Sequence, residues 1–321
     1  KAGTYNVTLT VYDDDNAKAS VTKEVVIASS ANTPPIANFS YIPASPTIQD
    51  TIRFIDSSYD TDGFITDYIW SFGDGNISKA GKCISFDGID DYVSIAHDDV
   101  FNSTSFSVEL WFKYDGEGSD GKIYWTLINK NPTGLGYNDA YHLWIQASDT
   151  TLRARIGNGT AQYYLNSGVN VDDGKFHHAV LVYDDSAKEY RLYVDGVLTA
   201  STSVPATWVP VTNTGDITIG VWKAYKDYFN GSIDDVRIYN RALSALEIQQ
   251  NYIGNVTTVG LVSWWKFDGD ANDCIGGNDG VVHGGEWQVL AKHKYAKAGT
   301  YNVTLTVYDD DNAKASVTKE V

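Results

Sequence analysis

The sequence predicts an all-β protein of two or three domains. Apolar and polar residues alternate over many short runs, which is the pattern of half-buried strands. Glycine, aspartate and asparagine separate the runs and supply turns. The 321 residues are enough for more than one domain, and 13% aromatic and 20% charged residues are typical of a globular protein. Short strands joined by such turns indicate a sandwich or a jelly roll.

One stretch of the chain occurs twice without a change, because residues 1–25 return as residues 297–321. Val7, Leu9 and Val11 alternate with polar residues, and an aspartate-rich turn leads to a second β-rich run. Each copy is therefore expected to form a hairpin, which is only marginally stable alone in water. An unchanged repeat indicates recent tandem duplication, so we expect one period of a longer repetitive protein.

Charge and acceptor motifs indicate the environment of the protein. The formal net charge of −17 argues against nucleic acid and anionic membranes as partners, since both select basic patches. No apolar run approaches the ~20 residues that span a bilayer. Acceptor triplets N-x-Ser/Thr favour an extracellular glycoprotein, although some arise by chance in a chain rich in Ser and Thr. They begin at Asn6, Asn38, Asn76, Asn102, Asn158, Asn230, Asn255 and Asn302.

Three β-type runs follow the first hairpin, at residues 36–41, 51–55 and 67–72. The segments PPIANFSY, SSYDTDGFITDYIWSFGDG and, much later, HKYAKAGTYNVTLTVYDDDN resemble a polycystic-kidney-disease (PKD) domain. This family is an immunoglobulin-like β-sandwich of extracellular proteins. It usually has WDFGDG where this chain has WSFGDG, a change that is not expected to alter the fold.

More than 200 residues separate the two PKD-like parts, and they are also rich in β-type runs. The motifs FDGIDDYV, SVELWFK, HHAVLVYD, YRLYVDG and GSIDDVRIYNRAL resemble, in this order, a laminin-G-like, concanavalin-type jelly roll. The segment GLVSWWKFDGDANDCIGGNDGVVHG resembles the opening segment of that family, but here it comes last. The resemblance therefore implies a circularly permuted jelly roll, which neighbouring termini would tolerate.

These resemblances define the predicted fold class, an immunoglobulin-like PKD β-sandwich with an inserted jelly roll. The expected parts are the last two strands of a preceding PKD-like repeat (1–28), a linker (29–35), the first PKD-like half (36–79), the jelly roll (80–290) and the second PKD-like half (291–321). Insertion into a loop is tolerated because closure entropy grows slowly with loop length.

The jelly-roll resemblance also implies a disulfide bridge. In the usual order of the family, Cys274 would lie on the loop that leads towards Cys83. These are the only two cysteines, and an oxidising compartment would permit their pairing. Two unpaired thiols are the alternative.

Candidate metal ligands come from the same resemblance. Alternation places Asp234 on the core face of its strand, where a carboxylate must be hydrogen-bonded or bound to metal. Related jelly rolls carry a structural calcium near this strand and the opening segment, so Asp234, Asp235 and Asp268 are candidate ligands. A turn capped by Asp234 is the alternative. Asp60 and Asp62, in the PKD-like turn, form a second candidate pair or are simply solvated.

Catalytic signatures are missing from the sequence. Jelly-roll glycosidases of the laminarinase type carry Glu-x-Asp-x-x-Glu on one strand, and no glutamates here have that spacing. His177 and His178 lie in an apolar run without an accompanying nucleophile motif, so they are expected to be structural. We therefore expect a protein that is not an enzyme.

Two functions fit these features. The first is a structural repeat of an extracellular stalk, sheath or filament, in which PKD-like sandwiches link copies of the unit end to end. The second is a carbohydrate-binding adhesin that holds glycans on jelly-roll aromatics. The candidate aromatics are Trp111, Trp125, Trp144, Trp208 and Trp222.

Overall fold

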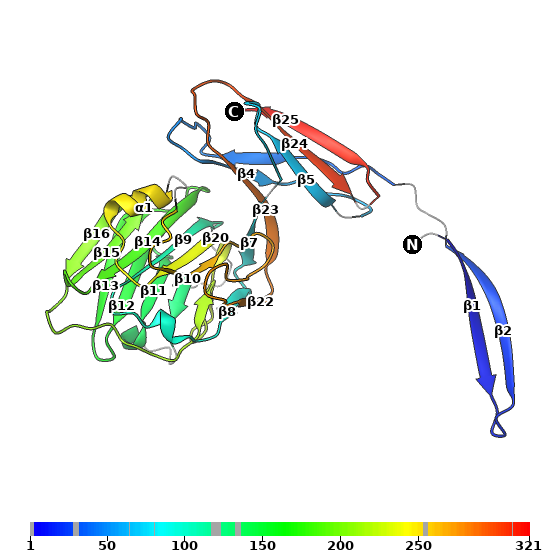
Figure 1. The fold of residues 1–321 in the computed structure, drawn as a ribbon, viewed down its shortest axis with the longest axis horizontal. Coiled ribbons are helices and arrows are strands. Elements are labelled where there is room, and N and C mark those ends of the chain that lie inside the picture. The colour runs from blue at the N-terminus through cyan, green and yellow to red at the C-terminus, as the bar shows by residue number, and fades with distance from the viewer. Residues whose placement is uncertain are drawn as a thin grey trace.

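The computed structural model describes residues 3–27, 32–63, 65–79, 81–116, 123–131, 136–252, 256–309 and 311–321. Its architecture is all-β, as predicted. The described residues contain one α-helix, α1 (Ala245–Tyr252), and two 3₁₀ turns, η1 (Asp99–Phe101) and η2 (Gly136–Asn138). Figure 1 shows a large sandwich and a smaller one joined through strand β23 (Glu286–His293), with a hairpin apart from both.

Two sheets enclose the core of the large sandwich. The longer one has the order β16 (Val197–Ser203), β15 (Glu189–Val194), β14 (Phe176–Asp184), β9 (Phe106–Tyr114), β20 (Asn230–Tyr239), β7 (Gly81–Asp87), β23, β4 (Ile52–Asp56) and β3 (Phe39–Ile42), with β21 (Leu261–Trp265) beside β20. The other has the order β13 (Gln162–Asn170), β12 (Thr151–Gly157), β11 (Tyr141–Gln146), β10 (Tyr124–Lys130), β17 (Ile217–Ile219), β8 (Tyr92–Ile95) and β22 (Gly280–His283). Two short strands, β18 (Val221–Trp222) and β19 (Asp227–Tyr228), pair with each other. Strands β21 and β22 come from the segment that resembles the opening segment of the jelly-roll family but comes last in this chain. Both strands lie within the large sandwich.

The small sandwich is built from both ends of the remaining chain. One of its sheets is the end of the long sheet, with β3 and β4. The other has the order β25 (Lys314–Glu320), β24 (Asn302–Asp309), β5 (Ile65–Ser71) and β6 (Ile77–Lys79). One hydrophobic cluster joins Phe54 and Trp70 from the first part to Val303 and Leu305 from the second. Segments separated by the whole large sandwich therefore share one core.

Strand β23 belongs to both sandwiches. Its first part, Glu286 to Leu290, pairs with β7, and its last part, Leu290 to His293, pairs with β4. The expected boundary between residues 290 and 291 thus falls inside a strand. Because backbone hydrogen bonds run continuously through this strand, it joins the sandwiches through a shared sheet.

The repeated sequence forms the predicted hairpin in both copies. In the first copy, β1 (Gly3–Tyr12) pairs with β2 (Lys18–Ile27), and the Asp13 carboxylate accepts hydrogen bonds from the backbone N–H groups of Asp15 and Ala17 in the turn. The predicted linker 29–35 lies partly outside the described residues, and the described part begins at Asn32.

Helix α1 was not predicted from the sequence. Its start carries a capping box: Ser244 Oγ accepts from the Glu247 N–H at 3.3 Å, and Glu247 Oε2 accepts from the Ser244 N–H at 2.9 Å. These reciprocal bonds satisfy N–H groups that a helix start leaves free. The Ser-x-x-Glu spacing is the sequence signal that marks the start of this helix.

The two copies of the repeat allow a matched test of burial. Leu305 is fully buried in the small sandwich, whereas Leu9, its counterpart, is 61% exposed. We expect Leu305→Ala to destabilise the small sandwich by about 2–5 kcal/mol and Leu9→Ala to change it by less than about 0.5 kcal/mol. Hydrogen exchange should be measured on β5, whose sequence is unique, because peptides from the two copies are identical. Equal effects of the two substitutions would contradict the assignment.

Candidate functional site

The face of the seven-stranded sheet that points away from the core carries aromatic side chains. On β11, Tyr141, Leu143 and Ile145 belong to the core cluster. Successive side chains of a strand point to opposite faces, so His142 and Trp144 lie on the outer face. β12 places Arg155 there by the same alternation, since Leu152, Ala154 and Ile156 face the core.

Arg155 lies at the centre of this outer-face cluster. Its guanidinium carbon is 4.8 Å from the ring centroid of Trp222, 5.5 Å from that of Trp144 and 5.6 Å from that of Tyr164. Tyr225 lies against Trp222, with ring centroids 4.4 Å apart. The indoles are 3% and 6% exposed, but Tyr164 is 51% and Tyr225 is 60% exposed. The tyrosines are therefore the accessible part, and the tryptophans are their base.

Buried polar groups fix Arg155 in place. Asp139, which is fully buried, pairs with the guanidinium, and Asn129 Nδ2 donates to the same carboxylate at 2.9 Å. Arg155 Nη2 also donates to His142 Nδ1 at 3.0 Å, so the proton of the neutral imidazole lies on Nε2, 3.1 Å from Thr126 Oγ1. Burial and the nearby guanidinium hold the pKa of His142 well below its ordinary value. The cluster is thus a rigid platform whose cation is already compensated.

A second candidate site lies where the two sandwiches meet. Arg53 stacks on Trp111, with its guanidinium carbon 3.4 Å from the ring centroid, and Tyr252 of α1 stacks on the same indole at 5.5 Å. Cavities of about 230 Å³ and 410 Å³ flank this stack and share its residues. Because Arg53 comes from β4 of the small sandwich and Trp111 from β9 of the large one, this contact locks the junction.

Two of the predicted calcium ligands, Asp234 and Asp235, form ion pairs with Lys292 where the two sandwiches join. Lys292 Nζ lies 2.5 Å from Asp234 and 2.6 Å from Asp235. The Lys292 ammonium occupies the position that a calcium ion would need, so these two carboxylates do not fit the predicted site. Desolvation raises the pKa of Asp234 against the attraction of Lys292, and Lys292 and Arg237 hold that of Asp235 low despite burial.

The predicted orientation of Asp234 was wrong because β20 contains a β-bulge. Ile233 and Val236 both face the core, although strict alternation would put them on opposite faces. Asp235 adopts a left-handed backbone with φ 52°, and the pairing with β9 shifts register between Asp234 and Arg237. Asp234 therefore points away from the core, towards Lys292.

The remaining predicted ligands are scattered. Asp268 accepts a hydrogen bond from the Lys82 N–H at 3.1 Å, and Asp62 accepts one from the Thr33 N–H at 3.0 Å. Asp60 Oδ1 accepts from the Asp62 N–H at 3.1 Å, as expected of a turn carboxylate.

A different carboxylate cluster was not predicted. Within the described part of the chain, Asp87, Asp90 and Asp91 form the one group of three potential ligands whose oxygens lie within 4.8 Å of one another. Its sequence signal is the FDGIDDYV motif, which brings three carboxylates to one turn. Burial is the main cause that raises the pKa of Asp91.

The predicted disulfide bridge is absent, since Cys83 and Cys274 are both free thiols. Cys83 is buried in a cluster with Ile55 and Leu290, whereas Cys274 is exposed between β21 and β22. The two cysteines therefore lie in different environments. Burial raises the pKa of the Cys83 thiol to about 12, which keeps it unreactive.

The predicted glycosylation sites differ in accessibility. Asn6, Asn38, Asn76 and Asn302 are exposed. Asn102, Asn158 and Asn230 are half-buried and hydrogen-bonded to neighbouring backbone. Asn255 lies outside the described residues. The four exposed positions are the ones at which we propose that glycans are attached.

Comparison with known proteins identifies the family. The profile of the laminin-G-like family within the concanavalin A-like lectin/glucanases superfamily matches residues 87–249. The chain belongs to the concanavalin A-like lectin/glucanases superfamily. Its large sandwich is accordingly a laminin-G-like jelly roll. Comparison with curated protein sequences found no match.

One solved structure supports the same fold, and others are similar over part of the chain. A candidate carbohydrate-binding protein from Bacteroides ovatus is 15% identical, with a TM-score of 0.50 over 92% of this chain and 93% of its own. A pentraxin from Limulus polyphemus is 12% identical (TM-score 0.48; 65% and 95% covered), and a CBM40 domain of a Ruminococcus gnavus sialidase, solved with sialyllactose, is 18% identical (TM-score 0.44; 54% and 97% covered). At such low identities the likeness concerns the fold alone.

The five tryptophans proposed for glycan contact have different roles. Trp125 and Trp208 belong to the jelly-roll core, and Trp111 lies in the junction. Trp144 and Trp222 do lie together on the outer face, but mainly as the base of the platform. Sequence reasoning missed the exposed members, Tyr164 and Tyr225. Tyr164 lies in the run QYYLNSG, which has the pattern of an ordinary strand, and Tyr225 lies in the charged run KAYKD, so neither run indicated an aromatic site.

Proposed function

We propose that the jelly roll binds carbohydrate on the outer face of its seven-stranded sheet. The observation that carries this proposal is the pair of exposed rings, Tyr164 and Tyr225, on either side of the rigid base formed by Trp144, Arg155 and Trp222. The apolar face of a sugar ring packs on such an aromatic surface, and the tyrosine hydroxyls can bond its hydroxyl groups. Membership of a superfamily that includes lectins supports this function.

The ligand is expected to be a neutral sugar. Asp139 compensates the charge of Arg155, which leaves little attraction for an anionic group. The net charge of −17 repels anions further. We propose an extracellular location, in agreement with the acceptor sites for glycans. No helix among the described residues is long and apolar enough to cross a membrane.

Binding should be tested on a glycan array and then by calorimetry with the best neutral ligand. We expect Tyr164→Ala and Tyr225→Ala each to weaken binding about tenfold, equivalent to one stacking contact of ~1.4 kcal/mol. Tyr59→Ala is the matched control, because Tyr59 is 53% exposed but lies in the small sandwich. Failure to bind any glycan, or unchanged binding by both tyrosine variants, would refute the proposal.

A second function, a structural unit of an extracellular filament or sheath, is favoured by one specific observation. The sequence of the exposed hairpin β1–β2 is repeated as β24–β25 inside the small sandwich. We propose that such a unit presents its carbohydrate-binding face at intervals along an assembly of copies.

A further inference from the structure

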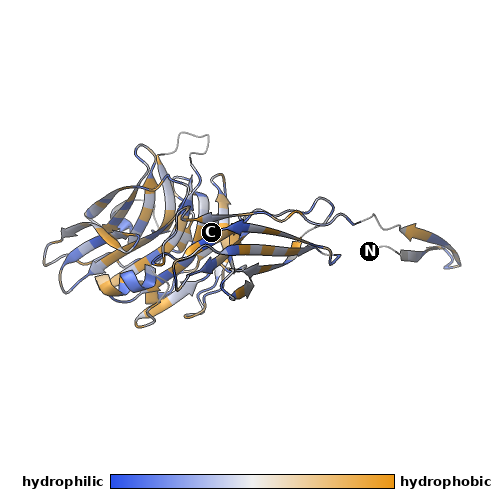
Figure 2. Ribbon diagram, turned by 90° about the horizontal axis from the view of Figure 1, so that it is seen from above, coloured by the Kyte–Doolittle hydropathy of each residue, from blue (hydrophilic) through white to orange (hydrophobic). Residues whose placement is uncertain are grey.

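The same sequence has two environments in this molecule. Val303, Leu305 and Val307 on β24 are fully buried against what we call the docking face, formed by Phe39, Phe54, Trp70, Phe72 and the edge of β5. Their counterparts Val7, Leu9 and Val11 on β1 are 57%, 61% and 52% exposed. Figure 2 shows hydrophobic residues along the hairpin, away from both sandwiches. The structure thus contains the surface that fits the exposed hairpin.

Backbone pairing repeats the same difference. In the small sandwich, β24 pairs with β25 on one side and with β5 on the other, where Leu305 lies opposite Trp70. Among the described residues, β1 pairs with β2 alone. Its other edge therefore offers the backbone N–H and C=O groups that β24 uses to bind β5.

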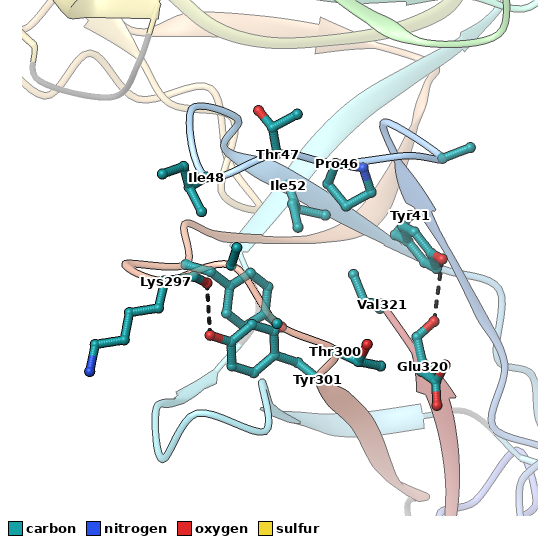
Figure 3. Close-up of a pocket in the computed structure, with 14 residues that line it drawn as sticks. Tyr41, Pro46, Thr47, Ile48, Ile52, Lys297, Thr300, Tyr301, Glu320 and Val321 are labelled. Atoms are coloured by element: carbon teal, nitrogen blue, oxygen red, sulfur yellow. Dashed lines mark hydrogen bonds between the residues drawn. The ribbon is translucent and has the colours of Figure 1, made fainter.

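Polar contacts make the docking face specific for this hairpin. Lys319 Nζ donates to Asn38 Oδ1 at 3.0 Å and to the Phe39 carbonyl, and it lies 5.0 Å from the centroid of the Phe39 ring. Tyr41 donates to the Glu320 carbonyl at 3.3 Å, and Figure 3 shows this bond beside Val321 at the end of the hairpin. In the first copy, Lys23 and Glu24 carry the same groups.

We propose that β1–β2 docks on the docking face of a second copy of this unit, in the position that β24–β25 holds here. Each unit has one docking face and two hairpins that fit it. The exposed hairpin can therefore dock only where the partner's own C-terminal hairpin is displaced or missing. Since the two contacting surfaces differ, successive units form an open linear row rather than a closed pair. This interaction is independent of carbohydrate binding.

The test opens the docking face in the full chain. Leu305→Asp would place a charge in the small-sandwich core, so β24–β25 should leave and vacate the docking face. In the unaltered chain the tethered hairpin competes at an effective concentration in the millimolar range, which keeps the face occupied. We expect sedimentation to show that the Leu305→Asp protein forms linear oligomers at micromolar concentration, with β5 amides protected from hydrogen exchange.

Two additional variants separate docking from nonspecific aggregation. Leu9→Asp, added to Leu305→Asp, removes the apolar face of the exposed hairpin and should weaken association at least about tenfold. Thr8→Asp, added instead, lies on the opposite, polar face and should leave association unchanged. A misfolded Leu305→Asp protein would aggregate equally with or without Leu9→Asp. That equality, or a monomeric Leu305→Asp protein, would overturn the proposal, whatever the result for carbohydrate binding.

Discussion

Replacing Arg237 by methionine is expected to lower the free energy of unfolding of the jelly roll by about 3–5 kcal/mol. Arg237 is buried on the outer face of the long sheet, where its Nη1 lies 2.5 Å from Glu109 Oε1 and its Nη2 lies 3.1 Å from Asp235. Glu109 is fully buried. Removal of the Arg237 guanidinium leaves the Glu109 carboxylate without a compensating charge, in surroundings that solvate an anion poorly.

Urea unfolding at neutral pH measures this loss. Arg153→Met is the matched control, because Arg153 pairs with Asp149 at 2.6 Å near the surface, where an ion pair contributes at most about 1 kcal/mol. Adding Glu109→Leu to Arg237→Met should recover part of the stability, since the unpaired charge is then removed. If Arg237→Met costs no more than Arg153→Met, the buried pair does not stabilise the fold as we infer.

The jelly roll is also expected to lose stability steeply between pH 6.5 and pH 5. Burial lowers the pKa of His178 to about 3, with Arg237 adding to the effect, and the pKa of His142 is likewise held low. Both imidazole rings stay neutral in the folded state. In the unfolded chain the same histidines bind protons when the pH falls below their ordinary pKa of about 6.5. Stability is therefore fully present above pH 6.5 and falls with pH, by about 1.4 kcal/mol per unit for each histidine.

Unfolding free energies at pH 7 and pH 5 test this linkage. The unaltered protein loses unfolding free energy between pH 7 and pH 5, and His142→Gln and His178→Gln should each make this loss smaller by about 2 kcal/mol. His177 provides the contrast, because Asp195 and Asp173 outweigh its burial and raise its pKa. The stabilisation that His177 contributes is present at low pH and disappears as pH rises. His177→Gln should therefore not reduce the loss of unfolding free energy between pH 7 and pH 5. If His142→Gln and His178→Gln both lose as much unfolding free energy as the unaltered protein, the carboxylates and not these histidines cause the sensitivity to acid.

Much of the fold could be predicted because strand formation depends on local patterns. The run predicted at 51–55 lies almost entirely within β4, and the motif HHAVLVYD lies within β14, since alternation is a local property of each run. The order of motifs was sufficient for the jelly-roll family. Local signals failed where a single residue changed the geometry, as in the bulge at Asp235, which turned Asp234 towards Lys292.

The candidate site depended far more on tertiary contacts. Tyr164 and Tyr225 lie on different segments, and only the folded sheet brings them to the two sides of Arg155 and Trp222. Trp111 looked equally suitable in sequence, but Arg53 from the other sandwich covers it. A pattern of residues shows what a side chain can contact, and long-range packing decides which contact is made.

The repeated hairpin shows this division most clearly. Its sequence determined two strands, a turn and one apolar face, and the structure has all three in both copies. Whether that face is buried depended on the surroundings alone, since Leu9 and Leu305 share every neighbour in sequence from residue 1 to 25 and from 297 to 321. Strand pairing within a hairpin is local, but burial needs a second surface. Trp70 and the edge of β5 supply that surface to only one of the two copies.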